Sequence, residues 1–133
     1  GVQTCALPIL LLGITVLTSL DEGDLSAVGQ KGPLLDQVRR LGALAKKSGL
    51  DGVVCSPREL QALRAECGRD FLLVTPGIRP AWTGSDDQKR ALTPKEAIEL
   101  GADYLVIGRP ITQSDNPAAA LARIADEIAP LVK

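Results

Sequence analysis

Short apolar runs alternate with segments of helical periodicity along this chain, and this alternation restricts the fold more than any other feature. The apolar runs lie at 10–17, 52–55, 71–74 and 105–107, and a helical segment follows each of them. Strands that alternate with helices form parallel sheets with right-handed crossovers. Four such units are half of a (β/α)8 barrel, which has about 250 residues. The pattern predicts an α/β fold equivalent to the C-terminal half, strands 5–8, of a TIM-type barrel.

The helical segments carry residues typical of helix starts and ends. Leucine and valine at helical spacing predict a helix over 33–48, which Gly49 closes. The sequences at 56–59 and 93–96 are capping boxes with proline at the first helical position. A short helix is expected over 21–28, and a last one from Asn116 to about Val132.

The chain partly repeats itself. The segment 49–54, Gly-Leu-Asp-Gly-Val-Val, resembles the segment 101–106, Gly-Ala-Asp-Tyr-Leu-Val. Each is expected to contain a helix end, a tight turn and a buried strand. The first run, 10–17, is nearly all apolar, which is typical of a strand covered on both faces.

Composition excludes several classes of function. The chain has no histidine, so no histidine-based triad or metal site lies within it, and we expect no metal. A net charge of −1 argues against nucleic acid as a partner, and no apolar run is long enough for a membrane span. Cys5, Cys55 and Cys67 lie far apart, which predicts reduced thiols in a cytoplasmic protein. Cys55 is expected to be a packed, inert thiol.

The first nine residues do not fit this pattern. The segment 1–9 lacks the charged start of a signal peptide and resembles a translated sequencing adapter, and the chain contains no methionine. The alternative is a natural loop that leads into the first strand. We expect 1–9 to be a non-native leader and 10–133 to be the half-barrel.

Two strands end in residues suited to binding phosphate. Gly108 and Arg109 follow the fourth apolar run, and Arg79 follows the third. A ligand approaches a glycine backbone closely, and the guanidinium group offers a planar set of donors. In a βα barrel, phosphate often binds after the last two strands. The alternative is a tight turn with a surface charge.

The segment between Arg79 and Leu92 is longer than most βα connections. A long polar loop beside a phosphate site suggests a lid that closes on the ligand, and Gln88 would then add a donor. The alternative is a surface loop without a role, in which Asp86 and Asp87 are solvated charges. Thr18, at the end of the first run, is a weaker candidate, because hydroxyl groups at strand ends often serve as caps.

These segments together resemble the bacterial type of the orotidine 5′-phosphate decarboxylase family. The resemblance extends from about Leu10 to the C-terminus, in order and with similar spacing. Its motifs lie at 15–19, 49–56, 75–80, 87–88 and 106–112.

The resemblance implies an enzyme that converts orotidine 5′-monophosphate (OMP) to UMP without a cofactor or metal, as a homodimer. It implies that Thr18 contacts the substrate near the pyrimidine and that Arg79 binds phosphate. It implies that Gln88 reaches the phosphate from the lid, and that Gly108 and Arg109 complete the phosphate site.

The chain also departs from this family. The resemblance implies a catalytic Asp/Lys network from the first half of the barrel and an aspartate from a second subunit, and no lysine here matches the catalytic one. We therefore expect no catalytic residue in this chain and little activity from it alone. The alternatives are another phosphate-binding barrel enzyme, such as a sugar-phosphate decarboxylase or aldolase, and a non-catalytic nucleotide-binding module.

Overall fold

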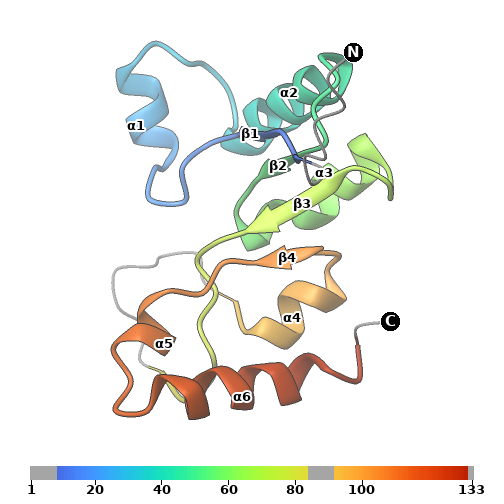
Figure 1. The fold of residues 1–133 in the computed structure, drawn as a ribbon. Helices are drawn as coiled ribbons and strands as arrows, with labels where there is room; N and C mark the ends of the chain where they lie inside the picture. Colours follow the sequence, from blue (N-terminus) through green and yellow to red (C-terminus); the bar gives the residue numbers. More distant parts are fainter. Residues whose placement is uncertain (1–8, 84–91, 132–133) are drawn as a thin grey trace, which may run out of the picture.

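A computed structural model describes residues 9–83 and 92–131 of the chain. Its centre is a parallel sheet of four strands, β1 (Leu12–Ile14), β2 (Gly52–Val54), β3 (Leu72–Thr75) and β4 (Tyr104–Leu105), arranged in the order of the chain (Figure 1). Helices connect successive strands, as the alternating pattern predicted. The α/β half-barrel prediction is therefore confirmed at the level of strand order and direction.

Six α-helices and one 3-10 helix lie in the described residues. They are α1 (Glu22–Ala27), α2 (Leu34–Lys47), η1 (Pro57–Glu59), α3 (Leu60–Cys67), α4 (Pro94–Glu99), α5 (Arg109–Thr112) and α6 (Pro117–Ile128). The predicted caps are present at Thr93, whose hydroxyl accepts the Glu96 N–H, and at Asn116, whose side chain accepts the Ala119 N–H. The last helix ends at Ile128, and the predicted end at Val132 lies outside the described residues.

The core lies between one face of the sheet and the helices. Val53 and Leu73 point into it and are almost completely buried, together with Leu60 and Leu63 from α3. Helix α2 packs on α3, and α6 packs on α4 and α5. Apolar area removed from water in this way contributes roughly 25 cal/mol per Å².

The opposite face of the sheet is apolar but exposed in this chain. Ile14, Val54, Val74 and Tyr104 pair in register across the four strands, so their side chains share one face. Ile14 is 64% exposed and Tyr104 is 52% exposed. The expectation that the first strand is covered on both faces is thus wrong for the described residues, because the helices cover only one. In a βα barrel, this uncovered face is the packed interior.

Both outer strands are shorter than predicted, and for β4 the path of the neighbouring strand explains the difference. The fourth was expected to centre on 105–107, but its last ladder bond runs from the Val106 N–H to the Thr75 carbonyl. Beyond Thr75, β3 continues into Pro76, which has no N–H, and Gly77, which has a positive φ of 77°. Within residues 9–83 and 92–131, no strand pairs with Ile107.

The sequence repeat corresponds to a repeated structure. Gly49 and Gly101 both have positive φ angles, 80° and 101°, and each follows the end of a helix. Asp51 precedes β2 and accepts the Leu11 N–H at 2.7 Å, while Asp103 precedes β4 and accepts the Leu73 N–H at 2.7 Å. In both repeats the aspartate therefore fastens the start of its own strand to the neighbouring strand.

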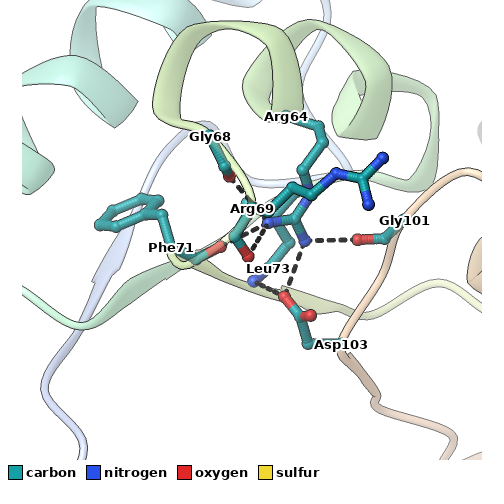
Figure 2. A network of polar contacts seen from close by, with 7 residues as sticks. All are labelled: Arg64, Gly68, Arg69, Phe71, Leu73, Gly101 and Asp103. Carbon is teal, nitrogen blue, oxygen red and sulfur yellow. Dashed lines mark hydrogen bonds and ion pairs between the residues drawn. The ribbon is translucent and has the colours of Figure 1, made fainter. Parts of the chain in front are cut away.

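One arginine joins several elements at this edge of the sheet. The Arg64 guanidinium donates to the carbonyl groups of Gly68, Arg69, Phe71 and Gly101 and to the Asp103 carboxylate, at 2.6 to 3.0 Å (Figure 2). It thus connects the end of α3, the turn before β3 and the end of α4. We call this set the Arg64 clamp. It lies at the N-terminal ends of the strands, where barrel residues usually serve stability.

Candidate phosphate site

Arg79 and Arg109 line the same pocket at the C-terminal ends of β3 and β4. The pocket has a volume of about 320 Å³. Its lining residues come from the segment after β3 and from α5 with the turn that follows it: Arg79, Trp82, Thr83, Arg109, Pro110, Gln113, Ser114 and Asp115. Two residues that the sequence singled out independently therefore lie beside one cavity.

The chain after β3 is held so that Arg79 reaches this pocket. Ile78 is 1% exposed and forms a parallel bridge with Leu92, at the other end of the connection. The Arg79 N–H donates to the Leu92 carbonyl at 2.9 Å. Both ends of the connection are therefore fastened together beneath the pocket, and the position of Arg79 is fixed by backbone contacts.

Arg109 is placed by the start of α5. The Gly108 carbonyl accepts the N–H groups of Ile111 and Thr112, at 2.9 and 3.1 Å, so the chain turns directly into the helix. A Cβ atom at Gly108 would meet no atom within 4 Å. Packing within the described residues therefore does not require glycine here, and its predicted role in admitting a ligand stays a prediction.

Several lining residues were not predicted from the sequence. Gln113 lies four positions after Arg109, a spacing that places two residues on one helical face and is visible in the sequence. Asp115 adds a carboxylate, which opposes an anion nearby and lowers the net positive charge of the pocket. The Arg123 guanidinium lies over the Trp82 ring, with its Cζ atom 3.8 Å from the ring centroid. No local sequence pattern links these two residues.

The other predicted site residues are not in this pocket. Thr18 lines a second pocket of about 370 Å³, with Arg58, Glu59 and residues 19–22 and 34–35. Thr18, which follows β1, therefore does not share a pocket with the two arginines, which follow β3 and β4. Gln88, Asp86 and Asp87 fall outside the described residues.

The buried thiol of Cys55 is a poor candidate for a catalytic nucleophile. Burial, and to a lesser extent the nearby Glu59 carboxylate, together raise the pKa of the Cys55 thiol to about 12. Cys55 is 1% exposed, which agrees with the predicted inert thiol.

Across residues 9–83 and 92–131, no group of three His, Cys, Asp or Glu side chains is arranged to hold a metal ion. Within the same part of the chain, no helix has the length and apolar character needed to cross a membrane.

The fold and the position of the pocket define a class of protein: a parallel βα half-barrel with an arginine-lined site beyond its last two strands. Residues 4–124 match the model of the "Orotidine 5′-phosphate decarboxylase / HUMPS family", and this chain belongs to that family.

Curated relatives agree with this assignment. An orotidine 5′-phosphate decarboxylase from Rhodospirillum rubrum is 59% identical over 118 residues, which are 89% of this chain and 48% of the relative. Another from Glaesserella parasuis is 56% identical over 120 residues, 90% of this chain and 52% of the relative. The chain therefore spans about half the length of these relatives.

Solved structures support the same fold. Orotidine 5′-phosphate decarboxylase from Lactobacillus acidophilus has a TM-score of 0.76 and 44% identity, over 89% of this chain and 48% of that one. The enzyme of the same name from Pyrococcus horikoshii has a TM-score of 0.61 at 22% identity, over 89% of this chain and 49% of that one, a likeness that concerns the fold alone.

Proposed function

We propose that this chain is the phosphate-binding half of an enzyme that decarboxylates OMP to UMP. The observation that carries the proposal is the shared pocket of Arg79 and Arg109, at the strand ends where barrel enzymes bind phosphate. Membership of the family makes a nucleotide monophosphate the fitting ligand. Gly108, beside Arg109, would let the phosphate approach the backbone, and Gln88 would reach it from the connection after Arg79.

The chemical role of this half is to supply binding energy away from the reacting bond. Each hydrogen bond from an arginine to a phosphate oxygen contributes about 1.5–3 kcal/mol. Loss of carbon dioxide leaves a carbanion on the pyrimidine, which needs a nearby positive charge and then a proton. Energy from the remote phosphate can be used to organise the groups that supply them.

Lys46 and Lys95 are not positioned for that step. Lys46 lies at the end of α2 and donates to the Cys67 carbonyl at 2.7 Å, at the edge opposite the phosphate pocket. Lys95 lies on the outer surface of α4 near Glu99. We therefore assign no catalytic residue to this chain and place the proton donor in the other half of the barrel, which would also bring Thr18 toward the pyrimidine.

The exposed apolar face supports a complete barrel as the active form. Ile14, Tyr104 and Val106 are each more than half exposed on the side that a barrel encloses. Four further strands would cover them and would pair with the outer edges of β1 and β4. We further propose that the complete enzyme is a homodimer of the cytoplasm, where the thiols of Cys55 and Cys67 stay reduced.

The experiment is to complete the barrel. Residues 10–133 are joined to the first half of the Rhodospirillum rubrum relative, and decarboxylation of OMP is followed by the loss of its absorbance. We expect activity from the chimera and none from the chain alone, although the chain should bind UMP. A folded chimera that binds UMP without decarboxylating OMP would contradict the proposed reaction.

A parallel titration separates the nucleotide enzyme from the alternatives. The chimera is titrated with UMP, ribose 5-phosphate and inorganic phosphate by calorimetry. A decarboxylase of nucleotides should bind UMP most tightly, because the base adds contacts that the sugar phosphate lacks. Equal affinity for UMP and ribose 5-phosphate would favour a sugar-phosphate enzyme.

A further inference from the structure

We propose that Arg123 is a positioning residue for the phosphate pocket and that it acts through Trp82. Trp82 lines the pocket beside Arg79, and Arg123 stacks over its ring at 3.8 Å. Arg123 itself does not line the pocket. Its part in ligand binding rests on the proposed function, whereas its hold on Trp82 does not.

The backbone that carries Trp82 is already fixed. The Pro80 carbonyl accepts both the N–H and the hydroxyl of Thr83, at 3.0 and 2.9 Å, which closes a turn over residues 80–83. Pro80, the first residue of this turn, is completely buried. What the turn leaves undetermined is the direction of the indole ring, and the stacked guanidinium group determines it.

Helix α6 is a suitable support for this contact. Ile124, next to Arg123, and Ala120 are buried, so the helix is anchored to the core on one side. The same helix packs on α5, which begins with Arg109. One rigid element therefore supports both the wall of the pocket at Trp82 and the helix that presents Arg109.

The expected effect is modest and measurable. A cation–π contact at an exposed site corresponds to an affinity change of about two- to fivefold if it is fully coupled to binding. Because the indole forms one wall of the pocket, a ring that samples other rotamers leaves the phosphate site less well defined. We therefore expect Arg123→Gln to weaken binding of inorganic phosphate and UMP by about that factor, and Arg123→Lys to restore most of it.

The chain has a single tryptophan, so its fluorescence reports on this ring alone. Without ligand, Arg123→Gln should change the emission spectrum and increase quenching by acrylamide. Arg123→Lys should resemble the wild type. Lys95→Gln, which removes one positive charge from neighbouring α4, is the matched control and should change neither. Unchanged emission and quenching in Arg123→Gln would overturn the proposal, whether or not phosphate binds.

A double-mutant cycle tests whether Arg123 acts through the ring. Calorimetric titrations with UMP are compared in the wild type, Arg123→Gln, Trp82→Ala and the double variant. If Arg123 acts through Trp82, its substitution has no further effect once the ring is gone; an equal loss in both backgrounds would mean direct electrostatic attraction and would overturn the proposal. Wild-type protein that binds neither UMP nor phosphate would contradict the proposed function. The ligand-free spectra would still show whether Arg123 holds the Trp82 ring.

Discussion

The two ends of the parallel sheet both depend on arginine, but in different surroundings. At the N-terminal end, Arg64 is surrounded by four backbone carbonyl groups and the Asp103 carboxylate (Figure 2). At the C-terminal end, Arg79 and Arg109 line a pocket. Arginine therefore connects structural elements at one end of the sheet and is a candidate ligand-binding residue at the other.

The difference shows that the surroundings of an arginine, not its residue type, decide its role: Arg64 lies among carbonyl groups, whereas Arg79 and Arg109 line a cavity. The Arg64 side chain is 19% exposed and already has protein acceptors for both terminal nitrogens. A further anion there would have to displace one of these contacts, which are partly buried. The pocket at the other end leaves space of about 320 Å³ beside its two guanidinium groups. The comparison predicts that removal of an arginine lowers stability at the N-terminal end and ligand affinity at the C-terminal end.

The largest effect is expected at the Arg64 clamp. Arg64→Leu should lower the free energy of unfolding by about 3 kcal/mol, because it removes the donor from several carbonyl groups and the ion-pair partner from Asp103. Urea denaturation followed by circular dichroism measures this. Arg69→Leu is the matched control, because only the carbonyl of Arg69 takes part in the clamp, and it should change stability by less than about 0.5 kcal/mol. A similar loss in both variants would remove the distinction between connector and surface arginine.

The second prediction concerns the pocket. Arg109→Ala should weaken UMP binding by about 10- to 100-fold, since a charge-assisted hydrogen bond contributes roughly 1.5–3 kcal/mol. Arg79→Ala should have an effect of similar size. Stability should be nearly unchanged in both variants. Calorimetric titration of the completed barrel measures the affinity, and Arg39→Ala, on α2, is the control. Unchanged affinity with an intact fold would contradict the assigned role of Arg109.

These two ends also differ in how far the sequence predicts them. Arg79 and Arg109 were predicted as a pair because each follows a strand end with glycine, a local signal that topology then brings together. The Arg64 clamp had no such signal. Four of its acceptors are main-chain carbonyl groups, which every residue has, and Gly101 lies 37 positions away in the sequence. Only the packing of α3 against the turns shows that contact.

The same distinction between local and distant information explains the other outcomes. Helix starts at Thr93 and Asn116 were predicted correctly, because a capping side chain lies within three residues of the N–H that it accepts. Strand ends were not predicted correctly. The last residues expected in β4 do not pair, because the neighbouring chain leaves the sheet at Pro76 and Gly77. The Trp82–Arg123 stack joins residues far apart in the chain, and no periodicity predicts it.

The repeated aspartates sharpen the comparison within the N-terminal end. Asp103→Asn should lower the free energy of unfolding by about 2 kcal/mol, and Asp51→Asn by about 1 kcal/mol, because both lose a charge-assisted bond to a strand N–H but only Asp103 also pairs with Arg64. Urea denaturation of both variants beside Arg64→Leu measures this. In the double variant with Arg64→Leu, the added cost of Asp103→Asn should fall toward that of Asp51→Asn. Equal costs in the single variants would mean that the ion pair adds nothing to the clamp.

The smallest expected effect lies at the C-terminal end, at the cap of α4. Thr93 follows Leu92, whose carbonyl accepts the Arg79 N–H, so this cap supports the pocket from below. Thr93→Ala should cost about 0.5–1 kcal/mol. Hydrogen bonds from the Thr93 backbone and hydroxyl lower the pKa of Glu96 below its ordinary value of 4.5. Its contribution to stability is therefore complete above pH 4.5 and is lost as the pH falls through the lowered pKa.

This sign gives a test that separates charge from geometry at the cap. Glu96→Gln keeps an acceptor for the Thr93 N–H but has no charge to lose, so the stability difference from the wild type should shrink as the pH falls below 4.5. Urea denaturation at several pH values between 3 and 7, about one unit apart, follows it. Glu99→Gln, at the other end of α4 and paired with the exposed Lys95, is the control. A difference that stays constant with pH would mean that the Glu96 charge does not stabilise this helix start, leaving the Thr93 hydroxyl as its cap.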